Sequence, residues 1–151
     1  MQLTLHTDYA IRTLVYLGLH PDRVVPVSEI AQAHGISTHH LAKVGQMLVQ
    51  EGWVSARRGR EGGLSLSPRT LELRLGALVR RSENHDLLEC FDRKTSQCAL
   101  TGFCRVERAL REAREAFFAA LDRYTLADLV SNRPQLLQLI ARGGRSAAAQ
   151  R

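Results

Sequence analysis

Residues 28–66 carry the pattern that most restricts how this chain can fold. Two short helical patterns follow one another there, and Gly35 separates them as the tight turn does in a helix-turn-helix pair. Strand-like residues then flank a charged, glycine-rich turn from Arg57 to Gly63, which is typical of a β-hairpin. A hairpin placed directly after a helix pair makes a winged helix. We therefore expect a mainly α fold, a winged helix-turn-helix with a small β-hairpin wing.

Helical periodicity before this pattern predicts one further helix. Thr7 or Asp8 is suited to cap it, and its apolar residues recur with helical spacing as far as Leu19. The β-branched residues at 24–27 predict a brief strand, after which Ser28 is expected to cap the first helix of the pair.

Past the hairpin the sequence predicts a short linking helix at 75–81 and a long helix at 106–124. Apolar residues of the long helix alternate steps of four and three, as in a coiled-coil seam. These seam residues are Val106, Leu110, Ala113, Phe117, Ala120 and Tyr124. Such a seam is buried against a second copy, so the helix predicts a homodimer. Thr125 is suited to cap one more turn, and a last short helix is expected at 136–141.

The charge of the chain points to an anionic partner. The net charge is +6, and of the 21 basic residues only Lys43 and Lys94 are lysines. Arginine presents a planar fork of donors that fits phosphate groups and guanine edges, whereas lysine is a point charge. This balance favours nucleic acid ahead of a membrane surface.

The most apolar segment, at residues 11–19, is too short to span a bilayer and contains Arg12. It also lacks the basic lead-in and small-residue cleavage site of a signal peptide. We therefore expect a cytoplasmic protein that does not enter a membrane, in a compartment where cysteines stay reduced.

The outer face of the second helix of the pair carries side chains that can read bases. Leu41, Val44 and Leu48 face inward, and polar residues stand opposite them. The arginine-rich hairpin tip fits a phosphate or an adjacent minor groove, and its glycines let the backbone approach the duplex. Any one of these features also fits an ordinary solvated surface, but their joint order favours double-stranded DNA. The predicted DNA-binding residues are Ser37, Thr38, His39, His40, Lys43, Gln46, Arg57, Arg58, Arg60, Gly62 and Gly63, with Gln50 on the same helix face.

Three cysteines, Cys90, Cys98 and Cys104, lie in one polar segment without periodicity. Cys104 stands at the start of the long helix, whose positive end favours a thiolate. Soft thiolates suit iron–sulfur clusters, zinc and copper(I), and the CxxC spacing of a closed zinc site is absent. Three buried, inert cysteines are the structural alternative, which the polar setting disfavours. An iron–sulfur cluster is therefore preferred.

A cluster of this kind usually has four protein ligands, so three cysteines leave one to be found. The fourth ligand can come from another residue type, another subunit or a small molecule. Within the segment the candidates are His85, Asp86, Glu89 and Asp92, and Asp8 is a distant one.

Several strings of the sequence resemble one family of regulators. They are Met1–Thr4 with Thr7–Tyr9, His40–Val44, Arg57–Gly63, the three cysteines, and Tyr124–Val130. On these residues the chain resembles the NsrR family of nitric-oxide-sensing repressors. That family belongs to a larger group of winged-helix regulators, which includes the iron–sulfur regulator IscR. The resemblance extends to about Leu139.

The resemblance implies a homodimeric repressor that leaves a palindromic operator when nitric oxide attacks the cluster iron. Cys90, Cys98 and Cys104 would be cluster ligands. Asp8 matches the position from which the partner subunit supplies an oxygen ligand. We prefer a 4Fe–4S cluster over 2Fe–2S. The seven residues between Cys90 and Cys98 exceed the spacing that the resemblance implies, and a loop absorbs the extra length.

Other functions fit parts of the sequence. A related iron–sulfur regulator would sense cluster supply, oxygen or redox state in place of nitric oxide. An iron–sulfur electron-transfer protein would have no need of an arginine-tipped wing. The sequence shows no phosphate-binding glycine loop and no nucleophile–base pair, so we do not expect an enzyme.

These patterns divide the chain into four parts. We expect a winged-helix DNA-binding domain at residues 1–82 and a cluster-binding cysteine loop at 83–104. A long C-terminal dimerisation helix with further helices is expected at 105–142, and a flexible tail at 143–151.

Overall fold

The computed structural model describes residues 2–148 of the chain, with side chains described as far as residue 141. The chain separates into two compact units. The first joins the residues up to Leu73 with those from Thr125 onward, and the second runs from Arg74 to Tyr124. Among the described residues, no helix is both long and apolar enough to cross a membrane.

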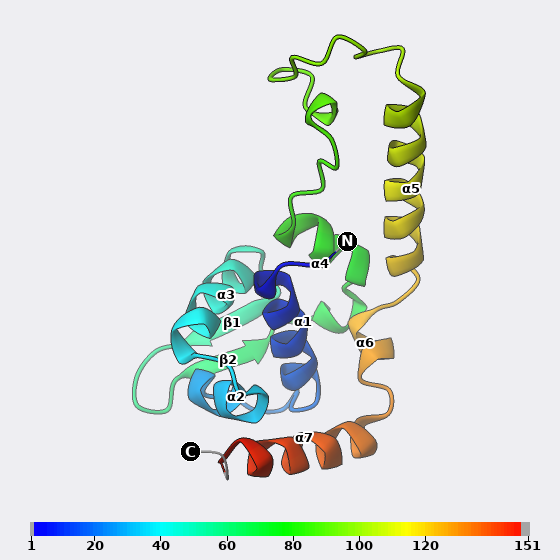
Figure 1. Cartoon of the computed structure of the whole chain (residues 1–151). Helices are drawn as coiled ribbons and strands as arrows, with labels where there is room; N and C mark the ends of the chain where they lie inside the picture. The colour runs from blue at the N-terminus through cyan, green and yellow to red at the C-terminus, as the bar shows by residue number, and fades with distance from the viewer. Residues whose placement is uncertain (1, 149–151) are drawn as a thin grey trace. The chain divides into compact units, whose positions relative to one another are not determined.

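The first unit contains the helix pair and the hairpin (Figure 1). Its elements in chain order are α1 (Leu5–Gly18), α2 (Val27–His34), α3 (Thr38–Gln50), β1 (Val54–Arg57) and β2 (Gly63–Leu66). The two strands pair antiparallel, with Val54 opposite Leu66 and Arg57 opposite Gly63. A helix pair followed directly by this hairpin confirms the winged helix-turn-helix expected from the sequence.

Aliphatic side chains from these elements form one core, in which α1 lies against α2, α3 and β2. The largest fully buried apolar side chains of the first unit are Leu14, Leu17, Leu19, Val25, Ile30, Leu41, Val44 and Leu48. Each contributes about 1.5–3 kcal/mol relative to an exposed position. Because three of them form the inner stripe of α3, the core fixes how that helix is rotated and which face it turns to solvent.

Two C-terminal helices complete the first unit. α6 (Leu126–Leu129) begins at a capping box. The Thr125 hydroxyl accepts a hydrogen bond from the Asp128 backbone N–H, and the Asp128 carboxylate accepts one from the Thr125 backbone N–H. α7 (Arg133–Ala148) packs against α2, and Arg133 Nε donates to the Leu19 carbonyl oxygen at 3.0 Å. The cap expected at Thr125 is confirmed.

The second unit consists of α4 (Leu75–Ser82), the 3-10 turn η2 (Glu89–Phe91) and the long helix α5 (Arg105–Leu121). Arg80 on α4 donates to both carboxylate oxygens of Asp122, at 3.0 and 2.6 Å, and lies 4.4 Å from the Phe118 ring centre. The ion pair lowers the pKa of the Asp122 carboxyl. Gly76 leaves room for this pair, because a Cβ there would lie 2.1 Å from Asp122 Oδ1.

The structure corrects the ends of two expected helices. α1 is capped by Thr4, whose hydroxyl accepts from the Thr7 backbone N–H, so neither Thr7 nor Asp8 is the cap. α5 ends at Leu121, and the last expected seam residue, Tyr124, lies beyond the helix.

The strand expected at 24–27 is also corrected. It is reduced to a single antiparallel bridge between Val25 and Leu64, because Pro26 is already the N-cap of α2 in place of Ser28. Proline supplies no backbone N–H for a longer ladder, and its fixed φ suits the start of a helix.

The last helix is longer than the sequence indicates. It was expected at 136–141 with a tail at 143–151, whereas α7 runs to Ala148. The remaining residues of that tail, 149–151, lie outside the described residues.

Candidate nucleic-acid interface and cysteine loop

The polar face of α3 is open to solvent. Leu41, Val44 and Leu48 are at most 2% exposed, whereas the residues opposite them are exposed. These exposed residues are Thr38, His39, His40, Lys43, Gln46 and Gln50. Gly35 ends α2 in the left-handed conformation, with φ 64°, and Ser37 is the N-cap of α3. None of the exposed side chains is acidic, so the face can present donors and acceptors to base edges.

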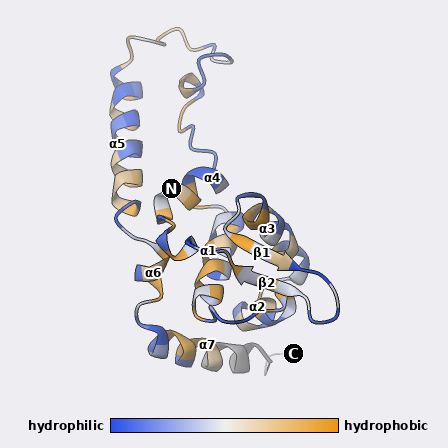
Figure 2. Cartoon of the chain, turned by 180° about the vertical axis from the view of Figure 1, so that it is seen from behind, coloured by the Kyte–Doolittle hydropathy of each residue, from blue (hydrophilic) through white to orange (hydrophobic). Residues whose placement is uncertain are grey.

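The loop between β1 and β2 concentrates positive charge and is coloured as hydrophilic in Figure 2. Arg57, Arg58 and Arg60 are exposed there. Within the part of the chain that the structure describes, none of the three forms an ion pair. Guanidinium groups without an internal partner are available to phosphate oxygens.

The hairpin itself requires Gly62 and Gly63. A Cβ at Gly62 would lie 2.5 Å from the Arg57 carbonyl oxygen, and one at Gly63 would lie 2.2 Å from that of Val25. With no side chain at 63, Leu64 and Val25 exchange two backbone hydrogen bonds of 2.8 Å each. The fold accounts for both glycines, and their part in approaching DNA stays a prediction.

The three cysteines are free thiols on one loop of the second unit, in three different environments. Cys90 is buried in η2, Cys98 is exposed, and Cys104 is half-buried as the N-cap of α5. Among the described residues, no group of three or more His, Cys, Asp or Glu side chains is already assembled to hold a metal ion.

The surroundings of Cys90 oppose a free thiolate. Its side chain is 4% exposed, and burial raises the pKa of the thiol. The charges of Glu107, Cys98 and Cys104 raise that pKa further. A bound cation reverses this effect, because it stabilises the thiolate. The expectation of a polar setting for every cysteine is therefore wrong for Cys90.

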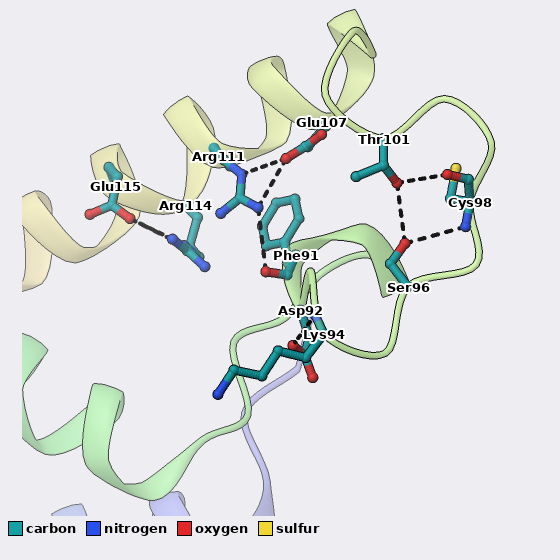
Figure 3. Close-up of polar contacts among 10 residues, drawn as sticks. All are labelled: Phe91, Asp92, Lys94, Ser96, Cys98, Thr101, Glu107, Arg111, Arg114 and Glu115. Atoms are coloured by element: carbon teal, nitrogen blue, oxygen red, sulfur yellow. Dashed lines mark hydrogen bonds and ion pairs between the residues drawn. The ribbon is translucent and has the colours of Figure 1, made fainter.

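The turn around Cys98 is held by hydroxyl groups, as Figure 3 shows. The Cys98 backbone N–H donates to Ser96 Oγ at 3.3 Å, and Thr101 Oγ1 donates to the Cys98 carbonyl oxygen at 2.7 Å. The two hydroxyl oxygens lie 3.2 Å apart. These bonds shape the backbone and leave the exposed sulfur of Cys98 unengaged by them.

Three of the four loop side chains proposed as a fourth ligand already have contacts within the chain. Glu89 Oε1 accepts from the Gln97 backbone N–H at 2.6 Å. The Asp92 carboxylate accepts from the Lys94 backbone N–H and from Thr95 Oγ1, at 3.0 and 2.9 Å. Of the other two, the His85 ring packs edge-on against Phe118, and Asp86 is exposed.

Asp8 belongs to the first unit, on α1. Arg12, one turn further along the helix, donates to both of its carboxylate oxygens, at 3.0 and 2.8 Å. This ion pair is partly open to water, since the side chains of Asp8 and Arg12 are 38% and 45% exposed. Such a partly exposed pair is weak enough to be exchanged for another partner.

Four residues beside the cysteines were not identified from the sequence: Phe91, Glu107, Arg111 and Arg114. Arg111 and Arg114 look like members of a solvated helix face, but the structure turns them toward Phe91 (Figure 3). Glu107 is 6% exposed and accepts from Arg111 at 3.0 Å. The spacing of 107, 111 and 114 on one helix face was the available signal.

Comparison with known proteins places this geometry in a family. The model of the Rrf2 family, described as iron-dependent transcriptional regulator, matches residues 3–132. The chain is 45% identical over 142 residues to the HTH-type transcriptional regulator NsrR of Geobacillus kaustophilus, covering 93% of this chain and 97% of that protein. It is 37% identical, with the same two coverages, to the regulator of that name from Bacillus subtilis.

Two solved structures share the fold. The match to T. potens IscR covers 87% of this chain and 88% of the IscR chain, with a TM-score of 0.70 and 20% sequence identity. CymR, the global cysteine regulator of B. subtilis, matches 87% and 98% with a TM-score of 0.70 at 23% identity. At these identities the likeness shows the fold alone. The family model matches most of the chain, and the NsrR regulators are similar to it over nearly their full length. This chain is therefore a DNA-binding transcriptional regulator and not an enzyme, and it belongs to the Rrf2 family.

Proposed function

We propose that this regulator is a homodimeric repressor that senses nitric oxide through an iron–sulfur cluster held by Cys90, Cys98 and Cys104. The observation that carries the proposal is the presence of three free thiols within fifteen residues of one loop of the second unit. The description of the family as iron-dependent supports iron. Nitric oxide as the signal is what the resemblance to the NsrR family implies, and relatives at 37–45% identity carry that name.

The chemistry of the donor set fits such a cluster. Thiolates are the ligands that iron–sulfur clusters take in proteins, and Cys104 is held in place as the N-cap of the 17-residue helix α5. When bound, the cluster supplies iron that nitric oxide can attack, and we favour 4Fe–4S over 2Fe–2S. Asp8 of the partner subunit is the proposed fourth ligand, an oxygen donor that soft iron holds less firmly than thiolate.

The proposal is tested on anaerobically purified protein by visible absorption and by fluorescence anisotropy with operator DNA. A cluster spectrum is expected, together with tight binding that is lost when nitric oxide is added. Equal operator binding with and without nitric oxide contradicts nitric-oxide sensing. Release on exposure to air or to an iron chelator instead would favour a relative that senses oxygen or cluster supply.

Asp8→Ala is expected to retain a cluster, with a small molecule as the fourth ligand, and to change its reaction with nitric oxide. Asp8→Cys should give a four-thiolate site that reacts more slowly, because thiolate is the firmer ligand. Stopped-flow absorption measures both rates.

The matched control for this prediction is Arg12→Ala, which removes the ion pair of α1 and keeps the carboxylate. The control should retain the native cluster spectrum. If the Asp8→Ala protein shows an unchanged spectrum and unchanged kinetics, Asp8 is not a cluster ligand. His85 or Glu89 then becomes the next candidate for the fourth ligand.

Arg58→Ala is expected to weaken binding to all DNA sequences alike. Its exposed guanidinium at the wing tip fits a phosphate contact, and one lost phosphate contact lowers the salt dependence of log K by about one unit. Replacement of His39 or Gln46 should instead alter base preference by roughly 1–3 kcal/mol per lost contact.

Anisotropy titrations over a range of salt concentrations separate the two effects. Arg108 is the matched control, an 85% exposed arginine of α5 that is paired with Glu112 and lies outside the winged helix. Arg108→Ala should leave the salt slope unchanged. Unaltered operator binding in the Arg58, His39 and Gln46 variants would contradict the assignment of this surface to DNA.

A further inference from the structure

The residue after the first cysteine, Phe91, packs against two arginines of α5, and we call this contact the clamp. The Phe91 ring is 8% exposed, and its centre lies 4.3 Å from the guanidinium carbon of Arg111 and 5.1 Å from that of Arg114. Arg111 Nη2 also donates to the Phe91 carbonyl oxygen at 3.4 Å. Both arginines reach from α5 toward this one ring in Figure 3.

Acidic partners fix both arginines in this position. Glu107, which is buried, accepts from Arg111 Nε at 3.0 Å, and Glu115 accepts from Arg114 Nη2 at 2.9 Å. The arginine side chains are only 34% and 18% exposed. Cation–π attraction is stronger where water is partly excluded, so the clamp is a favourable tertiary contact and not a loose surface pair.

The loop has a second contact with α5 at His85, which lies five residues before Cys90 and whose ring packs edge-on against Phe118. Beyond Phe91 its contacts are of another kind. The hydrogen bonds of Asp92, Ser96 and Thr101 run to residues within the loop itself. Cys104 needs no such contact to reach α5, because it is the N-cap of that helix. At Cys90 itself, the link to α5 passes through Phe91.

We propose that Phe91, held by Arg111 and Arg114, is a positioning residue that docks Cys90 onto α5 and so prepares the loop for the cluster. This inference rests on the proposed function of the cysteines. Seven residues separate Cys90 from Cys98, and closing a loop of this length costs conformational entropy. A clamp that already restrains one end lowers the cost of ordering the loop when iron binds, which is the effect of preorganisation.

Phe91→Leu tests the proposal, because leucine keeps apolar bulk and loses the cation–π contacts. Phe91→Trp restores a ring with a stronger face and should rescue the native behaviour. The loss of about 1 kcal/mol of cation–π attraction corresponds to about fivefold, so Phe91→Leu should release its iron about fivefold faster to a chelator such as bathophenanthroline. The visible circular dichroism of the cluster should weaken in the same variant.

Phe118→Leu is the matched control. Phe118 is 3% exposed and also lies under an arginine, Arg80 at 4.4 Å, and it contacts the loop at His85, five residues before Cys90 and outside the span from Cys90 to Cys104. Its replacement should lower thermal stability about as much as Phe91→Leu and leave iron release unchanged. Iron release that rises equally in both variants would show general destabilisation and overturn the positioning role.

A second measurement uses iron-free protein and does not depend on the cluster. Alkylation followed by mass spectrometry should modify exposed Cys98 faster than buried Cys90 in the native protein. Phe91→Leu, and Arg111→Lys as a variant of the other partner, should accelerate modification of Cys90 alone. Unchanged labelling of Cys90 overturns the clamp.

The two measurements distinguish the inference from the proposed function. If native protein binds no iron, the proposed function fails and the cluster role of Phe91 fails with it, whatever the labelling shows. If native protein holds a cluster, but Phe91→Leu releases iron at the native rate, only the positioning role is overturned.

Discussion

Replacing Cys104 with alanine is expected to abolish the cluster and, with it, tight operator binding. Cys104 is the N-cap of α5, so it is the cysteine whose backbone is fixed by a long helix. Without it, Cys90 and Cys98 supply two thiolates to a cluster that usually needs four ligands. Operator affinity should fall toward the nonspecific level, a loss of roughly 10³-fold or more at physiological salt.

Serine is the matched control at this position. Serine is a preferred N-cap residue, so Cys104→Ser preserves the start of α5 while it removes the thiolate. Absorption, iron content and operator anisotropy, all measured anaerobically, should show the same loss in both variants. If only Cys104→Ala loses the cluster and tight operator binding, the cause is a disturbed start of α5 and not the missing thiolate. Tight operator binding by cluster-free Cys104→Ala would overturn the cluster switch and leave DNA binding intact.

The winged helix could be predicted because its signals are local. The inward stripe of Leu41, Val44 and Leu48 repeats within one helix, and Gly35 and Thr125 act within one turn of the elements they end or begin. The hairpin tip is likewise short in sequence. The backbone at Gly63 also comes close to Val25, which is distant in sequence. The glycine itself was the sequence signal for this contact, and it does not name the partner.

The environment of the cysteines could not be predicted in the same way. Phe91 meets Arg111 and Arg114 across twenty or more residues of sequence, and a cation–π contact leaves no periodic pattern. Burial of Cys90 follows from that docking. The polar composition of the loop indicates a solvated segment. It does not show that Phe91 packs against α5 and that Cys90, next to it, is buried.

The helix α5 uses two stripes of side chains for different purposes. Glu107, Arg111, Arg114 and Phe118 form the stripe that faces the Cys90 turn and α4. The seam stripe is offset from it by one residue, or about 100° around the helix. Its members are not buried within the chain: Val106 is 59% exposed, and Leu110 and Phe117 are half-buried. The stripe that carries the predicted dimer contact is therefore separate from the one that holds the cysteine loop.

Glutamate at Leu110 or Phe117 is expected to convert the proposed dimer into monomer or aggregate. Both side chains are half-buried in the single chain, and a second copy would remove them from water. A charge placed in such an apolar seam loses its hydration without a partner. Two linked modules bind about 10²- to 10⁴-fold more tightly than one, so operator affinity should fall by roughly a hundredfold or more. Analytical ultracentrifugation and operator anisotropy measure the two effects.

Ala119→Glu is the matched control, since Ala119 is an exposed residue of α5 on the side away from the seam. It introduces the same charge into the same helix and should leave both the dimer and operator binding unchanged. The cysteine loop provides a second check, because Leu110 and Phe117 lie outside the stripe that contacts Phe91. Alkylation of Cys90 should therefore stay slow in a monomeric Leu110→Glu protein. A Leu110→Glu, Phe117→Glu double variant that still sediments as a dimer would show that the two copies meet elsewhere.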